Sequence, residues 1–142
     1  MKTYISWKQY DEYIDKIVNW VSKQDFLNIG AVYGLPRGGL PIAVSLSHKL
    51  GLPLMMNYDD RKVITDKQIL VVDDIADTGH TLNRFKEEER NIICTFHFHK
   101  QSIVRPDFYC EDKGDKWIVY PWETLNSKEI QDYLNEGEHI NA

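Results

Sequence analysis

The sequence contains no apolar run near the length of about 20 residues that a membrane-spanning helix requires. Its first residues, MKTYISWKQYDEY, also lack the hydrophobic stretch of a secretory signal. We therefore expect a cytoplasmic protein with no membrane partner. Cysteine is scarce as well, because only Cys94 and Cys110 occur, and their spacing fits neither a metal site nor a disulfide framework. Both are expected to be reduced thiols in the core.

Positive charge is also in short supply. The 17 Lys and Arg residues face 22 Asp and Glu residues, which gives a net charge of −5. Proteins that bind nucleic acid usually carry a basic surface, so no nucleic-acid partner is expected. A polyanionic ligand would have to be met by local donors or by a metal. Internal repeats, low-complexity tracts and Gly/Ser linkers are missing too, so residues 1–142 are expected to form a single domain.

Helical and strand patterns alternate along the chain. Apolar residues recur at helical spacing after a capping box at Ser6 and Gln9, and a second helical pattern ends before Gly51 and Pro53. The expected helices are 7–23, 40–50, about 78–90 and 127–135, and the expected strands are 29–34, 52–58, 69–74, 92–100, 107–110 and 116–120. This order is typical of an α/β fold in which helices flank a mostly parallel, twisted central sheet.

The most informative stretch is ILVVDDIADTGHTL, residues 69–82. Its apolar start, 69–72, is typical of a central parallel strand that is buried on both faces. The turn that follows carries Gly79 and the hydroxyls of Thr78 and Thr81, and a helix beginning there would point backbone N–H groups at an anion. The aspartates before the turn should face neutral or cationic groups, such as ribose hydroxyls or Mg²⁺. The stretch therefore predicts a ribose 5-phosphate site with a metal beside it.

This stretch resembles the phosphoribosyl diphosphate (PRPP) motif of type I phosphoribosyltransferases, an apolar strand with two acids and then D-T-G-x-T. Residues 32–54, with RGG at 37–39, resemble the diphosphate loop and the following helix of the same family. The resemblance runs from about Ile5 to Glu123 and is greatest to the bacterial xanthine-guanine and hypoxanthine branch.

The resemblance implies a type I phosphoribosyltransferase fold with a small C-terminal base-binding hood. It implies a Mg²⁺-dependent enzyme whose substrates are PRPP and a purine base, namely guanine, xanthine or hypoxanthine. The products would be the nucleoside 5′-monophosphate and pyrophosphate. Relatives commonly assemble, so a homo-oligomer, dimer or tetramer, is expected.

The resemblance also assigns roles to residues. Asp77 would be the proton partner of the purine and Arg37 would neutralise diphosphate charge, which makes these two the expected catalytic residues. Asp73 and Asp74 would hold the ribose hydroxyls and Mg²⁺. The peptide bond between Pro36 and Arg37 is expected to be cis, as it often is in the family. The residues expected at PRPP and its phosphates are Pro36, Arg37, Gly38, Gly39, Asp73, Asp74, Asp77, Thr78, Gly79, His80 and Thr81. Those expected at the base are Lys100 for an exocyclic oxygen, Trp117 for stacking and Ile118 for backbone contacts.

The sequence departs from the family in one segment. Only fourteen residues separate Leu54 from Ile69, where relatives usually carry a long mobile loop that closes over the active site. We therefore expect a shortened flexible loop, in which Arg61 or Lys62 either reaches the diphosphate or lies at a solvated hairpin tip.

Two other functions stay open at this point. The acceptor could be another base, or the chain could be a nucleotide- or PRPP-binding regulatory protein without turnover, although Asp77 and Arg37 weigh against the latter. His97 and His99 alternate on a strand as metal ligands can, but no third ligand accompanies them, so a structural pair is expected.

Overall fold

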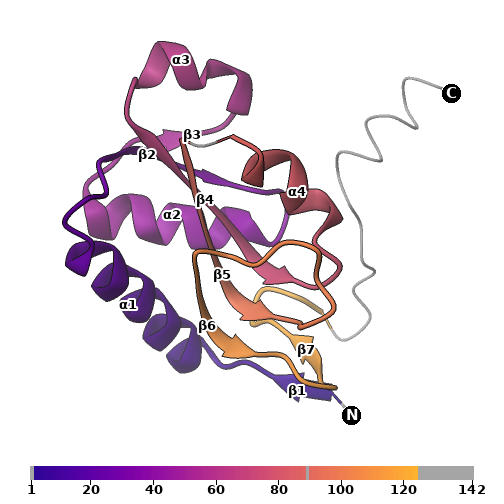
Figure 1. The fold of residues 1–142 in the computed structure, drawn as a ribbon. Coiled ribbons are helices and arrows are strands. Elements are labelled where there is room, and N and C mark those ends of the chain that lie inside the picture. Colours follow the sequence, from indigo (N-terminus) through magenta and orange to yellow (C-terminus); the bar gives the residue numbers. More distant parts are fainter. Residues whose placement is uncertain (1, 89, 125–142) are drawn as a thin grey trace, which may run out of the picture.

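Five parallel strands form the central sheet, seen in a computed structural model that describes residues 2–88 and 90–124 (Figure 1). They are β2 (Ile29–Gly34), β3 (Leu54–Met55), β4 (Gln68–Ala76), β5 (Asn91–Phe98) and β6 (Phe108–Asp112), in the order β3-β2-β4-β5-β6. Every neighbouring pair is parallel, so the carboxyl ends of the strands meet at one edge. The expected α/β fold is confirmed.

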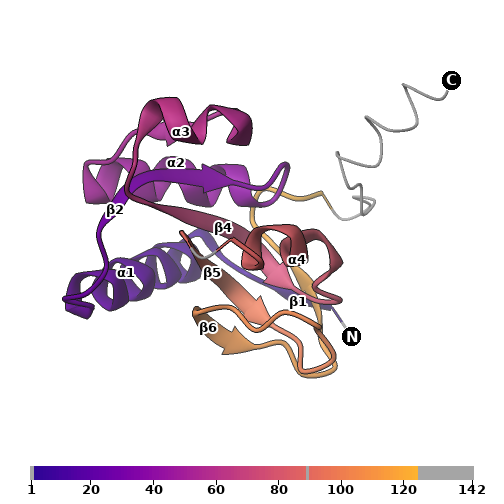
Figure 2. The ribbon, with the colours of Figure 1, turned by 45° about the horizontal axis from the view of Figure 1, so that its top comes forward.

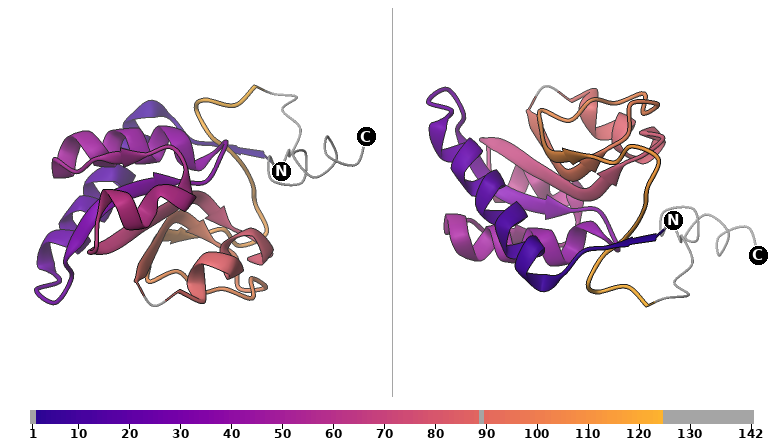
Figure 3. Two further views of the ribbon diagram at one scale, coloured as in Figure 1. Left: turned by 90° about the horizontal axis from the view of Figure 1, so that it is seen from above. Right: turned by 90° about the horizontal axis from the view of Figure 1, so that it is seen from below.

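Helices and short helical turns cover both faces of this sheet (Figures 2 and 3). On one face α1 (Trp7–Lys23) and α2 (Gly39–Leu50) pack over Leu70 and Val72. On the other face α4 (His80–Lys86) and the 3-10 turn η1 (Tyr58–Asp60) pack over Ile69 and Val71. Alternate residues of β4 thus enter two different hydrophobic cores, and all four are fully buried. This confirms the prediction of a central strand buried on both faces.

The ends of the first two helices follow the sequence signals. The Ser6 hydroxyl accepts a hydrogen bond from the Gln9 amide at 3.1 Å, and the Gln9 side chain accepts one from the Ser6 amide at 3.0 Å. Gly51 ends α2 with a φ of 67°, a conformation that costs glycine little. Both cap predictions are confirmed.

A second, two-stranded sheet forms the small hood. The strand β1 (Lys2–Tyr4) pairs in parallel with β7 (Trp117–Val119), with Lys2 opposite Trp117 and Tyr4 opposite Val119. Figure 1 shows this sheet beyond the carboxyl ends of β4 and β5. Two segments far apart in sequence, 2–4 and 117–119, therefore build a wall over that edge of the central sheet.

Several element boundaries differ from the prediction. The strand expected over 52–58 is only Leu54–Met55, and the expected hairpin is instead η1 followed by α3 (Arg61–Ile64), because the Asn57 side chain caps the turn and Tyr58 is buried beneath it. The strand β4 continues through its acids to Ala76, since β5 goes on pairing with it. The helix α4 ends at Lys86 rather than near residue 90, and the helix expected over 127–135 lies outside the described residues.

The two cysteines are free, with Cys94 buried and Cys110 half-buried. No helix within residues 2–88 and 90–124 combines the length and the apolar character that a membrane crossing requires.

Candidate functional site

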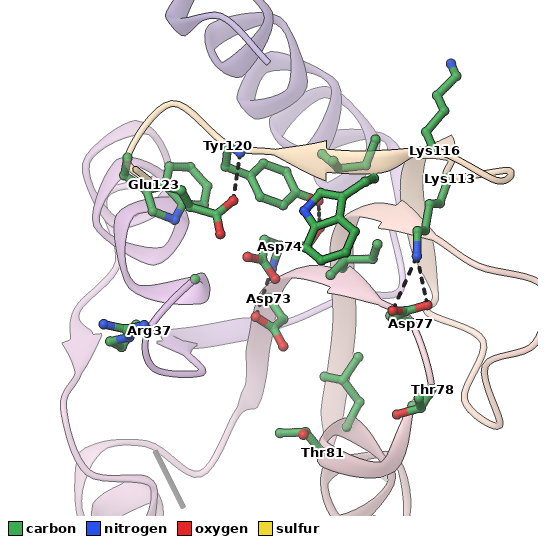
Figure 4. A pocket seen from close by; sticks show the side chains of 18 of the residues that line it. Arg37, Asp73, Asp74, Asp77, Thr78, Thr81, Lys113, Lys116, Tyr120 and Glu123 are labelled. Carbon is green, nitrogen blue, oxygen red and sulfur yellow. Dashed lines mark hydrogen bonds and ion pairs between the residues drawn. The ribbon is translucent and has the colours of Figure 1, made fainter. Parts of the chain in front are cut away.

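A cavity of about 580 Å³ opens at the carboxyl end of β4 (Figure 4). Its lining comes from the loop after β2 (36–38), from β4 and the turn that follows it (73–79 and 81–82), and from residues within 113–123. Most of the residues predicted at PRPP line it, but Gly39 and the exposed His80 do not. The motif and the diphosphate-like loop, far apart in sequence, therefore share one cavity.

The loop after β2 lies directly against the acids of β4. Its Pro36–Arg37 peptide bond is cis, as expected. A Cβ atom on Gly38 would lie 2.1 Å from Asp74 Oδ2, and one on Gly39 would lie 2.4 Å from the backbone oxygen of Val72. Only glycine allows these approaches, so the second and third residues of the RGG sequence set how closely the loop meets the strand.

Asp73 and Asp74 form an electrostatically costly pair. The backbone amide of Asp74 donates a hydrogen bond to Asp73 Oδ1 at 2.9 Å, which ties the Asp73 carboxylate to the backbone of Asp74. Burial raises the pKa of Asp73 well above its usual range, and the charge of Asp74 raises it further. Burial also raises the pKa of Asp74 to about 6, with a further contribution from the charge of Glu123. A cation or hydroxyl donors bound beside the pair would relieve this cost.

The Asp73–Asp74 pair could hold a magnesium ion whose other ligands come from a bound phosphate compound and water. Within the described ranges no cluster of three or more His, Cys, Asp or Glu residues is arranged to hold a metal. Mg²⁺ is commonly held in proteins by one or two carboxylates, with substrate phosphates and water as the other ligands. The oxygens of Asp73 and Asp74 fit this donor set. Among the described residues they are not joined by the further side chains that a metal centre made of protein ligands alone would need.

The raised pKa of Asp74 predicts a pH-dependent stability. Between about pH 4 and about pH 6 the folded state binds more protons than the unfolded state, so the free energy of unfolding falls as the pH rises through this window. Asp74→Asn is therefore expected to raise the free energy of unfolding above pH 6 by roughly 1–3 kcal/mol, and the gain should shrink toward pH 4. Thermal unfolding across this range measures it, with the exposed Asp15→Asn as the control; a variant less stable than wild type near neutral pH would contradict the prediction.

The turn after β4 has the features of an anion site. Gly79 has a φ of 85° and precedes α4, and a Cβ atom there would lie 2.5 Å from Ser102 Oγ. Thr78 and Thr81 line the cavity beside it. The helix begins at His80 rather than at Thr78, so the backbone amides of its first turn follow the glycine.

Asp77 lies at the cavity with the Lys113 side chain pointing at its carboxylate (Figure 4). Lys113 Nζ lies 3.3 and 3.4 Å from its two carboxylate oxygens. The Gln101 amide donates to the same carboxylate at 3.1 Å, and His99 Nδ1 lies 3.4 Å from it. The carboxylate is thus held in place while one side of it borders the cavity.

The hood supplies the facing wall. Trp117, whose surface is 65% exposed, and the buried Ile118 both line the cavity. Lys100 does not line it; β5 ends at Phe98, and Lys100 is exposed in the turn beyond. The lysine beside Asp77 is Lys113, at 3.3 Å, and the role of Lys100 at the base stays a prediction.

Sequence reasoning missed part of this wall. Lys113 and Lys116 carry no motif signal, whereas the letters PWE, residues 121–123, did hint at Trp122 and Glu123. Tyr120, just before them, was also missed, although it lines the cavity and stacks on Trp122 with ring centroids 5.1 Å apart.

The short segment between β3 and β4 contributes nothing to the cavity lining. Arg61 forms an ion pair with Glu88 at 3.1 Å, and its guanidinium lies over the Tyr58 ring at 4.5 Å. In this conformation Arg61 therefore does not reach the loop expected to bind the diphosphate.

Comparisons with known proteins agree with the fold. The phosphoribosyl transferase domain family matches residues 55–125. The chain is 28% identical over 147 aligned positions to a xanthine-guanine phosphoribosyltransferase of Desulfotalea psychrophila, covering 87% of this chain and 88% of that protein. It is 27% identical over 139 positions to an orotate phosphoribosyltransferase of Sulfurisphaera tokodaii, covering 88% and 69%.

A solved structure gives the same result. The crystal structure of a purine phosphoribosyltransferase from Pyrococcus horikoshii superposes with a TM-score of 0.73 and 32% identity, over 91% of this chain and 99% of that one. The parallel sheet, the cavity at its carboxyl edge and these matches together lead to one conclusion: the chain belongs to the phosphoribosyltransferase family.

Proposed function

We propose that the protein transfers the 5-phosphoribosyl group of PRPP to a 6-oxopurine, namely guanine, xanthine or hypoxanthine. The products are the nucleoside 5′-monophosphate and pyrophosphate. The observation that carries this proposal is that the acid pair, the anion turn and Trp117 line a single cavity, so a phosphorylated sugar and an aromatic base can be bound side by side. The relatives named for purine and xanthine-guanine substrates support the same acceptor class.

PRPP would be bound along three parts of the cavity. The turn with Thr78, Gly79 and Thr81 binds the 5-phosphate, and His80 lies next to this turn. The loop 36–39 binds the diphosphate, with the Arg37 guanidinium neutralising charge on the leaving group. Mg²⁺, held by Asp73, Asp74 and PRPP oxygens, would add to that neutralisation. The acids themselves accept hydrogen bonds from the ribose hydroxyls.

The base would lie between Trp117 and Asp77. The Trp117 ring is exposed enough to stack on a purine, and Ile118 offers backbone groups to its edge. Asp77 takes the proton of the imidazole nitrogen. In a 6-oxopurine this nitrogen and the exocyclic oxygen are neighbours on one edge. Lys113 lies beside Asp77 at 3.3 Å, so the two side chains can meet both atoms at once.

Lys113→Met is expected to raise KM for the 6-oxopurine about tenfold or more, because a charge-assisted hydrogen bond to the exocyclic oxygen is lost. The matched variant Lys100→Met removes a lysine outside the cavity lining and should change KM much less. Initial rates at saturating PRPP measure both values. A larger rise in KM for Lys100→Met than for Lys113→Met would contradict the role of Lys113 and indicate that Lys100 recognises the base.

An orotate acceptor is the second candidate, since an orotate phosphoribosyltransferase aligns with 88% of the chain at similar identity. A PRPP-binding protein without turnover is the third, because the segment expected to form the lid adds no residue to the cavity lining. One experiment separates all three: purified protein is mixed with PRPP, Mg²⁺ and each base, and the nucleotide is measured. Nucleotide from orotate alone, or from no base, would contradict the 6-oxopurine assignment.

A further inference from the structure

Tyr120 joins the hood to the strand that carries the acid pair. It directly follows β7, is only 3% exposed, and donates its hydroxyl proton to the backbone oxygen of Asp74 at 3.1 Å (Figure 4). Its ring stacks on Trp122, which also lines the cavity. Tyr120 thus follows a strand of the hood and contacts the backbone of the acid pair.

The hydrogen bond from Tyr120 to the Asp74 oxygen lies just beyond the point where β2 stops pairing with β4. Pairing between β2 and β4 ends at Gly34 and Val72, where the Val72 oxygen accepts from the Leu35 amide at 3.0 Å. Carbonyls two residues apart along a strand point to the same side, so the Asp74 oxygen points to the side that β2 has left. Tyr120 therefore supplies the donor that the sheet no longer provides, at the residue where the acids emerge.

His97 fixes the direction of the Tyr120 hydroxyl. Its Nδ1 atom lies 2.8 Å from the Tyr120 oxygen; in the tautomer with a proton on Nδ1, His97 donates to Tyr120 while Tyr120 donates to the Asp74 oxygen. Burial lowers the pKa of His97 to about 4, so the ring is neutral near pH 7 and one of its nitrogens carries the single proton. Its Nε2 atom lies 3.8 Å from Glu111, too far for a hydrogen bond. Glu111 is instead bound by the Tyr13 hydroxyl at 2.7 Å.

We infer that Tyr120, oriented by His97, is a positioning residue that holds the Asp73–Asp74 segment in the geometry that binds PRPP, an inference that rests on the function proposed above. In the proposed reaction Tyr120 touches no reacting atom. It acts through the backbone of Asp74, and the neighbouring carboxylates follow that backbone.

The structure offers a matched control in Tyr58. This residue is 8% exposed, donates to Glu88 at 2.7 Å and accepts from the Asn91 amide at 2.6 Å, so its hydroxyl has one donor and one acceptor as that of Tyr120 does. It lies outside the cavity lining. Tyr58→Phe and Tyr120→Phe thus remove equivalent groups from the interior, and only one of them borders the acids.

The test compares both variants with wild type by two measurements. Amide hydrogen exchange is followed over residues 73–77 in ligand-free protein, and PRPP binding with Mg²⁺ is measured by calorimetry. Tyr120→Phe is expected to exchange faster over 73–77 and to bind PRPP about tenfold more weakly, whereas Tyr58→Phe keeps wild-type values in both. His97→Leu, which removes the donor to Tyr120, is the second variant and should shift both values in the same direction.

Steady-state kinetics separates positioning from general damage. We expect KM for PRPP to rise in Tyr120→Phe while KM for the base changes little. Wild-type exchange over 73–77, or wild-type PRPP affinity, in Tyr120→Phe would overturn the inference. A wild-type protein that forms no nucleotide would instead overturn the proposed function, and the exchange data would still decide whether Tyr120 holds the acid segment.

Discussion

Replacing Asp77 with asparagine is expected to lower kcat about 1,000-fold while the fold is retained. Asparagine has the size of aspartate and can still accept hydrogen bonds from Lys113 and Gln101, which lie 3.3 and 3.1 Å from the carboxylate. It cannot take a proton from the imidazole nitrogen of the base. Initial rates at saturating PRPP and base measure kcat, and single-turnover rates show the loss in the chemical step apart from product release.

Asp15→Asn is the control for this substitution, since Asp15 is exposed and pairs only loosely with Lys49 at 3.5 Å. It should keep wild-type kcat. A kcat within tenfold of wild type in Asp77→Asn would rule out proton transfer by Asp77, and the base would then have to react without this partner.

Gly38→Ala is expected to lower kcat/KM for PRPP about 100-fold with little change in stability. Gly38 has a φ of −62°, which alanine adopts without strain, so the backbone can stay in place. The added Cβ would lie 2.1 Å from Asp74 Oδ2, and the carboxylate must move by about 1 Å to avoid it, a displacement that can cost a factor of about 100 in rate. Kinetics with varied PRPP, alongside thermal unfolding, measures both effects.

Gly39→Ala gives the contrasting result. Its Cβ would lie 2.4 Å from the backbone oxygen of Val72, and a strand in the centre of the sheet cannot move aside. We expect this variant to lose about 1–3 kcal/mol of unfolding free energy or more. If Gly38→Ala kept wild-type kcat/KM for PRPP, the close contact between the loop and Asp74 would have no role in binding.

Much of the fold follows from local patterns in the sequence. The four apolar residues 69–72 predict a strand buried on both faces, and the structure gives each face its own core. The strand β1 was missed because three largely exposed residues, Lys2–Tyr4, carry no periodic signal. They form a strand only through pairing with β7, which lies more than a hundred residues further along the chain.

The candidate site likewise has one part that local sequence patterns predict and another part that depends on the tertiary fold. Residues 73–81 are contiguous and could be assigned to a phosphate and sugar site from their order alone. Lys113 and Tyr120 belong to the site only because β6 and β7 bring them over the edge of the sheet. No local sequence pattern predicts this placement. Lys100 was assigned to the base from the family resemblance; it lies exposed two residues beyond the end of β5, and its role stays a prediction.

The segment between β3 and β4 was expected to be short, and it is. Its helical conformation could not be predicted, because it depends on tertiary contacts of Tyr58 with Phe85 and of Arg61 with Glu88. These contacts tie the segment to α4 and the turn after it.

The measurement that tests the central claim most directly is nucleotide formation from PRPP by the purified protein. With Mg²⁺ present, guanine, xanthine and hypoxanthine are each offered beside adenine and orotate, and nucleotide and pyrophosphate are quantified by chromatography. We predict nucleoside 5′-monophosphate and an equal amount of pyrophosphate from at least one 6-oxopurine, none from adenine or orotate, and almost none from Asp77→Asn in parallel. PRPP left intact with every base would contradict the proposed transfer reaction.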